Sequence, residues 1–486
     1  EWLGLRPGNL SPNLWRKVSY RPKRFQANPF SIEQLSRLEK RVLDYGEQEG
    51  YPFATIQYDS LHIEENALKA VLNVNFGPFI TFDSLQVRDQ QVIKSSVLGS
   101  YLGIKLGKKY NQKLVDAVVP KLNRLNYLRL KDAPVLSFQN SEGKLVVDVA
   151  ARKVNTIDGI IGFLPNNSRE SGLLITGQFD LELYNPFRTG KEIGLHWRRL
   201  SEETQQLNLN FRQPHLLGSG ISFEGDFDFL KQDSTFTRRD LSVELQINTG
   251  IYSTLGITTH TTNTDLLATS AFINSSSLPD ILDFKLNRYG LRYRFDKRDE
   301  PILPKKGFFI ELEGTVGNKT IRQNAELPDE LYQNIDLTTL QYQYDLHVEN
   351  YIPIGTKSGF VAELHGGHLS NDNLFRNDAF RLGGLQSLRG FNESFFFATS
   401  YLYSNLETRF FFDELSYLLV FADVGYVEGD FGEVKNLDRV LGFGTGVSFA
   451  TNTGIFNFVY ALGTSQAVGG INFNQSKIHF GFTSRF

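Results

Sequence analysis

Cysteine is absent from the 486-residue chain. Its absence excludes disulfide bonds, thiol catalysis and zinc sites built on cysteine ligands. The sequence also lacks an apolar run that approaches the roughly 18 residues of a membrane helix. With 51 basic and 54 acidic residues, the net charge of -3 gives no reason to expect a nucleic-acid partner. The chain opens at Glu1 without an apolar leader, so we expect any signal peptide to have been removed or never included.

Aromatic residues and glycine are abundant instead. The chain has 40 Phe, 20 Tyr and 42 Gly, a composition typical of aromatic-rich strands whose backbones approach closely. We therefore expect a largely β protein. The mean hydropathy of -0.27 is low for a helical membrane protein. It is compatible with a membrane β-barrel, because the polar residues that face the lumen of a barrel dilute its hydropathy.

Helix and strand patterns alternate in the first part of the chain. Ser31 and Gln34 form a capping box, and apolar residues follow at helical spacing, so a helix begins here. Two strands come next, in "FATIQYDSLHI" and "ALKAVLNVNF". The pattern then repeats with the strand "FITFDSLQV", a helix over residues 110–127 and a closing hairpin. We predict an N-terminal segment over residues 1–24, followed by two small α+β domains over residues 25–79 and 80–152.

The helical patterns disappear in residues 153–486, where segments of about ten residues alternate between apolar and polar side chains. In "RYGLRYRF", Tyr289 and Tyr293 share one face of the predicted strand, and Arg288 and Arg292 share the other. An outer-membrane barrel turns its apolar face toward lipid and keeps charges in its lumen. The segments number about sixteen, an even number as bacterial outer-membrane barrels require. We predict a membrane β-barrel of about 16 antiparallel strands.

The lengths of the connections agree with this count. If the first strand runs outward from the periplasm, outer loops follow odd strands and periplasmic turns follow even strands. Long connections are predicted after odd strands, over residues 263–282, 318–336, 370–398, 428–439 and 463–476. Short connections such as "NPFRTG" and "NTG" follow even strands, which is the asymmetry of outer-membrane barrels.

Two motifs lie in the sixth outer loop and on the thirteenth predicted strand. The loop contains "RLGGLQSLRGF", whose last residues are Arg389, Gly390 and Phe391. The strand contains "FADVG", which supplies Phe421, Asp423 and Gly425. Alternation along this strand places Asp423 in the lumen. Asn405, Glu407 and Arg409 share the predicted inner face of strand twelve, where they could extend a lumen network.

Together with the barrel count and the two preceding domains, these motifs resemble the superfamily of POTRA-plus-barrel outer-membrane proteins. It includes the assembly factors BamA and TamA and the secretion transporter FhaC. The resemblance implies that the sixth loop folds into the lumen, where Arg389 pairs with Asp423. A guanidinium offers a planar fork that a carboxylate accepts at two points, so this pair would anchor the loop. The resemblance also implies that the α+β domains are POTRA-like and periplasmic, and it extends to the terminal strand that ends at Phe486.

Other motifs favour no catalytic or metal site. His365 and His368 of "HGGH" point to opposite faces of a strand, which argues against a pair of metal ligands. The glycines of "GFGTG" imitate a phosphate loop, but no helix follows them. A basic cluster between Arg16 and Arg24 indicates a solvated segment, and no serine-hydrolase motif is present. We predict no catalytic residue, no metal, no cofactor and no enzymatic activity, with a hydrolase inside the barrel as the enzyme alternative.

The predicted function is the assembly or insertion of outer-membrane proteins. A POTRA-like sheet edge can accept an extended client as an added strand. The first barrel strand is short and contains two glycines, so its seam with the last strand should be weak. In relatives that insert barrels this seam opens sideways. The residues that we assign to the seam and the terminal strand are Ile160, Phe480, Phe482 and Phe486.

Two alternatives stay open. Two POTRA-like domains also match the two-partner-secretion transporters, which export a polypeptide through the lumen. Those transporters usually carry a plug helix, and residues 1–28 show no helical period, which favours assembly. A passive porin would need neither the domains nor the anchored loop. We expect outer-membrane lipid, client polypeptides and accessory periplasmic or lipoprotein subunits as partners, and no nucleic acid. A further interpretation is that Arg389 and Asp423 only stiffen the barrel.

Overall fold

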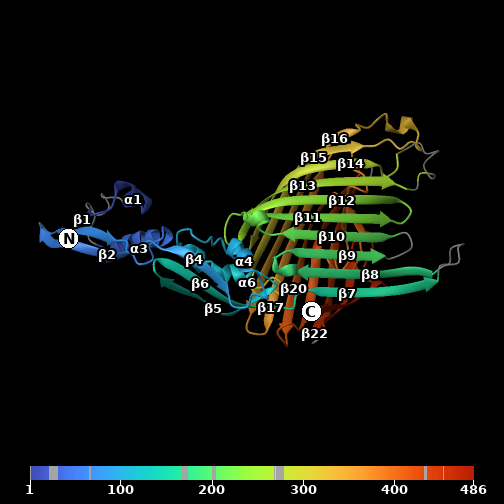
Figure 1. Cartoon of the computed structure of the whole chain (residues 1–486). Helices are drawn as coiled ribbons and strands as arrows, with labels where there is room; N and C mark the ends of the chain where they lie inside the picture. The colour runs from blue at the N-terminus through green and yellow to red at the C-terminus, as the bar shows by residue number, and fades with distance from the viewer. Residues whose placement is uncertain are drawn as a thin grey trace. The chain divides into compact units, whose positions relative to one another are not determined.

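The computed structural model describes most of the chain: residues 2–20, 31–64, 67–165, 173–199, 204–267, 269, 278–431, 435–451 and 454–485. These residues form two small three-stranded sheets with helices and a closed barrel (Figure 1). A further two-stranded hairpin lies within one of the barrel's connections. None of the helices in the described residues combines the length and the apolar character that crossing a membrane requires.

The first α+β unit contains three strands and two described helices. Its elements are β1 (Trp2–Pro7), α1 (Pro12–Lys17), α3 (Ile32–Gln48), β2 (Thr55–Glu64) and β3 (Ala67–Asn75). The sheet order is β1-β3-β2, with β1 parallel and β2 antiparallel to β3. Helix α3 begins where the capping box predicts, because the Ser31 side chain accepts a hydrogen bond from the Gln34 backbone. Leu38 and Val42 are buried in the core of this unit, as the helical spacing predicts.

The N-terminal segment is part of this first sheet. The prediction treated residues 1–24 as a segment that precedes the domain, whereas β1 pairs with β3 along its whole length. Trp15 of α1 is buried in the same core. The difference arises because "WLGLRP" pairs in parallel with a strand some 65 residues away, and local periodicity carries no information about such a partner. The boundaries at residues 79 and 152 stay predictions.

The second α+β unit repeats the topology of the first. Its elements are β4 (Thr81–Val87), α4 (Ser95–Leu102), α5 (Gln112–Asp116), α6 (Val118–Asn123), β5 (Leu128–Gln139) and β6 (Glu142–Ala151). The sheet order β4-β6-β5 has its first strand parallel to the middle strand, as in the first unit. The single helix predicted over residues 110–127 is wrong, because it is divided into α5 and α6. Pro120 has no N–H to donate to the carbonyl of Asp116, where α5 ends.

The barrel closes on itself through sixteen strands in the described residues, as predicted. In chain order they are β7 (Thr156–Pro165), β8 (Leu173–Tyr184), β9 (Glu192–Arg199), β10 (Gln205–Gln213), β11 (Ile221–Gln232), β12 (Phe236–Asn248), β13 (Ser253–Leu266), β14 (Phe284–Asp296), β15 (Gly307–Ile321), β16 (Thr338–Ile354), β17 (Ser358–Ser370), β20 (Ser400–Phe411), β21 (Tyr417–Asp430), β22 (Lys435–Ala450), β23 (Gly454–Thr464) and β24 (Lys477–Arg485). Each strand is antiparallel to its neighbours.

The alternation of side chains is confirmed. On β14, Tyr289 and Tyr293 are exposed on the outer face, whereas Arg288 is buried inside the barrel. An exposed aromatic face is what a barrel presents to lipid.

The connections follow the predicted asymmetry, with one correction. The connection after strand eleven covers residues 371–399, is called loop six below, and contains the hairpin of β18 (Phe380–Leu382) and β19 (Phe396–Ala398). The long loop predicted over residues 428–439 is wrong, because β21 extends to Asp430 and β22 begins at Lys435. Lys435 lies 2.6 Å from Glu428 and 3.3 Å from Asp430, so these charges pair between the two strands of a hairpin.

Candidate functional site: the loop-six anchor and the barrel seam

Arg389 of loop six is held by two acidic residues of the barrel wall. Its Nη2 and Nε donate to Asp423 of β21 over 2.6 and 3.0 Å, and its backbone N–H donates to the same carboxylate over 2.9 Å. Its Nη1 donates to Glu407 of β20 over 2.8 Å. Asp423 is 0% exposed, so the pair is shielded from solvent. The planar guanidinium thus spans two strands and accounts for the chemistry of the "LRGF" and "FADVG" motifs.

Aromatic rings surround this ion pair. The Arg389 guanidinium carbon lies 3.7 Å from the centroid of the Phe421 ring, a cation–π geometry. Phe391 is buried and packs edge-on against Phe396 with ring centroids 4.9 Å apart. The Phe421 ring shields the guanidinium from water, and this strengthens the attraction of the ion pair because charges interact more strongly where water is excluded.

The backbone of loop six lies directly against barrel strands at Gly390. Gly390 has φ = +94°, a conformation that favours glycine, and a β-carbon there would collide with the backbone of Leu462 on β23. Gly425, predicted as part of the partner motif, lies opposite Tyr403 of β20, whose backbone and β-carbon fill the space beside it.

The predicted network on β20 is brought together by the fold. Asn405 Nδ2 donates to the carbonyl of Ser387 in loop six over 2.8 Å. Arg409 Nε donates to Glu407 over 2.5 Å, so Glu407 lies between two arginines. Two arginines and two carboxylates therefore lie together around the anchor, so each buried charge has a partner of opposite sign.

A second attachment of loop six was missed by the sequence analysis. Lys319 of β15 and Asp378 of the loop form an ion pair in which both side chains are 0% exposed. Lys319 Nζ also donates to the Asn373 carbonyl over 2.8 Å and lies 4.5 Å from the centroid of Phe284. Alternation places Lys319 in the lumen, as it does for other charged residues, and no signal in the sequence distinguishes it. Loop six is therefore held at two points, Asp378 and Arg389.

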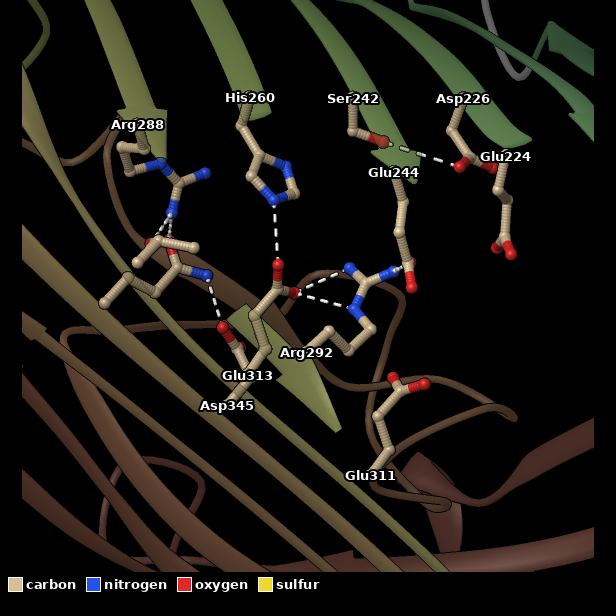
Figure 2. Close-up of polar contacts among 12 residues, drawn as sticks. Glu224, Asp226, Ser242, Glu244, His260, Arg288, Arg292, Glu311, Glu313 and Asp345 are labelled. Atoms are coloured by element: carbon tan, nitrogen blue, oxygen red, sulfur yellow. Dashed lines mark hydrogen bonds and ion pairs between the residues drawn. The ribbon is translucent and has the colours of Figure 1, made fainter. Parts of the chain in front are cut away.

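The lumen wall formed by β11 to β15 carries a ladder of ion pairs. Figure 2 shows Arg292 of β14 between Glu313 of β15, at 2.6 Å, and Glu244 of β12, at 2.7 Å. His260 of β13 lies 2.9 Å from the same Glu313, and Arg294 reaches Glu224 at 3.3 Å. Alternation predicts that these side chains face the lumen but not that they pair. The ladder links strands that are one, two or three positions apart in the sheet.

The seam between the first and last barrel strands is short. Ser484 pairs with Ile157 and Arg485 pairs with Thr156 on β7. By contrast, β7 pairs with β8 from Thr156 to Pro165. The register between β24 and β7 is not continued over the rest of their described residues.

The other predicted seam residues lie on or beyond these strands. Phe480 is exposed on the outer face of β24, and Phe482 packs against Phe456 with centroids 4.5 Å apart. Ile160 belongs to β7, and Phe486 lies outside the described residues. The roles that we assign to these positions stay predictions.

Comparisons with known proteins show which family the chain resembles. A model described as the Omp85 superfamily domain matches residues 185–486. CdiB from Acinetobacter baumannii is similar with a TM-score of 0.62 and 13% identity, over 100% of this chain and 89% of that one. CdiB from Escherichia coli has a TM-score of 0.60 and 11% identity, over 100% and 90%. BamA from Haemophilus ducreyi lacking POTRA domains 1–3 has a TM-score of 0.48 and 15% identity, over 100% and 99%.

Proposed function

The chain belongs to the Omp85 superfamily of outer-membrane β-barrels, and we propose that it is an assembly factor that inserts other polypeptides into the outer membrane. Family membership supports a general role in polypeptide insertion or secretion. The proposed role is non-enzymatic, with the α+β units in the periplasm and client polypeptides as partners.

The observation that carries the proposal is the short seam. Strand β24 pairs with β7 only near Thr156 and Ile157 among the described residues, so few hydrogen bonds need to break for the barrel to open there. Opening would expose two strand edges at the height of the lipid, and unpaired backbone groups in lipid are strongly unfavourable. A client strand that pairs with these edges would form hydrogen bonds with their backbone groups, and this pairing would favour insertion of the client.

The edges of the α+β sheets support a first step of client capture. In the first unit β2 is an edge strand, because the sheet order is β1-β3-β2. An extended client can add to such an edge through backbone hydrogen bonds, which accept many sequences.

Export through the lumen is the alternative. A cavity of about 610 Å³ lies beside loop six and is lined by charged side chains, including Arg238, Asp240 and Arg381. A polypeptide passing through the lumen would have to displace loop six from both the Arg389 and the Lys319 attachments. Because both attachments are buried ion pairs, this displacement is unfavourable, and we favour the lateral route.

A disulfide across the seam tests the proposal. Continuing the register of β24 and β7 would place Gly481 opposite Ile160, three residues beyond the pair of Ser484 and Ile157. We expect Ile160→Cys with Gly481→Cys, once oxidised, to stop insertion of a client barrel into liposomes, and reduction to restore it. The chain has no other cysteine to compete, and neighbouring registers are scanned for cross-linking.

The matched control keeps the same cysteine on β24. Asn457 of β23 is paired with Gly481, so Asn457→Cys with Gly481→Cys forms a disulfide within a hairpin that need not open. We expect this cross-linked protein to insert clients normally. Full insertion by the oxidised seam variant would reject lateral opening, and secretion of one client polypeptide by that variant would support transport through the lumen.

A further inference from the structure

Two histidines and two glutamates form adjacent cross-strand pairs on β16 and β17. The strand register sets His347 opposite His365 and Glu349 opposite Glu363. All four positions share the lumen face, because they alternate with exposed outer residues such as Tyr344 and Ile352. None of them takes part in the anchor or in the seam.

The donor atoms of three of these residues converge. One donor atom each of His347, Glu363 and His365 lies within 4.8 Å of the other two. The two imidazole rings stack with centroids 4.2 Å apart and an interplanar angle of 21°. His365 Nε2 lies 3.3 Å from Glu363 Oε2.

One ring nitrogen of His347 has no hydrogen-bond partner among the described residues. Nε2 of His347 is buried and, among the described residues, makes no hydrogen bond. It lies 3.3 Å from Glu349 Oε1, but the other oxygen of Glu349 accepts from Arg298 and from Tyr351, each over 2.8 Å. A buried polar atom without a partner is unfavourable in a folded protein, and a ligand that coordinates it would remove the penalty.

We propose that His347, His365 and Glu363 bind a divalent transition-metal ion such as Zn²⁺. Two imidazole nitrogens and one carboxylate oxygen are a ligand set that this class of ion accepts, with a further position left for water or for another oxygen. Metal–nitrogen distances of about 2.0–2.1 Å require donor atoms about 3.4 Å apart in a tetrahedral site. Because the donor atoms lie up to 4.8 Å apart, binding of the ion requires the three side chains to turn toward one another, which separates the two stacked imidazole rings.

The bound ion would connect to the strand that holds loop six. Tyr403 of β20 stacks on His365 with centroids 4.8 Å apart, and Glu363 lies opposite Asn405 of β20 in the register. Asn405 contacts loop six through Ser387. Binding of the ion would therefore hold β16 and β17 together, and β17 pairs with β20, the strand that contacts loop six.

Cobalt binding tests the site, because Co²⁺ takes the ligands of Zn²⁺ and reports its coordination by visible absorption. The full chain is purified in detergent without a histidine tag, treated with chelator and titrated with Co²⁺, and equilibrium dialysis gives the stoichiometry. We expect one ion per chain and ligand-field bands that Zn²⁺ abolishes. His347→Gln, His365→Gln and Glu363→Gln should each lower the affinity at least about tenfold.

The chain offers two matched controls. His368 belongs to the same "HGGH" motif but is exposed on the outer face, so His368→Gln should bind as the unaltered protein does. His196 lies between Asp180 and Glu182, at 2.9 and 2.7 Å, and these three side chains are also of types that bind metal ions. His196→Gln therefore tests whether this second cluster, and not the proposed site, holds the bound Co²⁺. Absence of stoichiometric binding in the unaltered chain would overturn the proposal, even if a ligand variant failed to fold. Loss of binding in His196→Gln alone would also overturn it.

Discussion

The carbonyl oxygen of Arg389 occupies the space that a β-carbon on Gly442 would need. Gly442 lies on β22, opposite Asp423 of β21, so the same short stretch of wall receives both the backbone and the side chain of Arg389. Close contact between two backbones leaves no room for adjustment by a flexible side chain. The position of loop six therefore depends on a glycine as well as on a charge pair.

We expect Gly442→Ala to displace the loop at Arg389 and to destabilise the anchored state by about 1–3 kcal/mol, as overpacking does in a filled core. Limited proteolysis of loop six and the heat-induced change in electrophoretic mobility measure the effect. Gly220→Ala is the control, because no heavy atom lies within 4 Å of a β-carbon there. Wild-type protease resistance in Gly442→Ala would contradict the expectation.

The anchor itself makes a second prediction. Arg389→Ala leaves Asp423 buried without its cation, and Asp423→Ala removes three of the hydrogen bonds to Arg389. Each should destabilise the anchored state by about 3–5 kcal/mol and impair insertion of client barrels. Thermal unfolding in detergent and a liposome insertion assay measure the two effects. Arg439→Ala, on an exposed arginine of β22, serves as control.

The charge swap distinguishes pairing from packing. Arg389→Asp with Asp423→Arg should recover only part of the loss, because the Arg389 backbone N–H loses its acceptor and Glu407 faces a second carboxylate. If the single variants kept full activity and heat stability, the anchor would have no functional role.

Sequence alone predicted the barrel more completely than the contacts inside it. Alternation placed Asp423 in the lumen, because successive side chains of a strand point to opposite faces of the sheet. Its pairing with Arg389 came from a family resemblance, since periodicity does not tell where a loop returns. The attachment of Lys319 to Asp378 was missed for the same reason. The division between α5 and α6 at Ala117 has a local signal, because Pro120 cannot donate a backbone hydrogen bond to Asp116.

The Lys319 attachment gives a third prediction. Lys319→Met leaves Asp378 as a buried unpaired charge, so we expect a destabilisation of about 3–5 kcal/mol and faster cleavage of loop six between residues 371 and 380. The double variant with Asp378→Asn should be milder than Lys319→Met alone, because it removes both charges and keeps an acceptor for the Phe375 N–H. Lys285→Met, at an exposed position on β14, is the control. A double variant less stable than Lys319→Met would contradict a buried ion pair.

The edge strand β2 of the first α+β unit gives the fourth prediction. Leu61 and Ile63 are 63% and 74% exposed on this edge, and Ser60, with φ = +53°, bends the strand beside them. Under the proposed client capture, apolar side chains next to free backbone groups form a surface on which an extended apolar strand can pair. We expect Leu61→Asp with Ile63→Asp to weaken binding of a labelled peptide from the last strand of a barrel protein at least about tenfold, or about 1.4 kcal/mol.

A control of equal exposure separates the edge from general hydrophobicity. Ile32 is 70% exposed and belongs to α3, so Ile32→Asp removes a similar apolar surface without changing a residue of β2. Fluorescence anisotropy with the full chain in detergent measures all three proteins, and their circular dichroism checks that the sheet is retained. Equal loss of peptide binding in Ile32→Asp and in the edge variant would show that clients contact the unit through apolar surface in general. In that case strand addition at β2 would be rejected, while insertion at the seam would be unaffected because it depends on different strands.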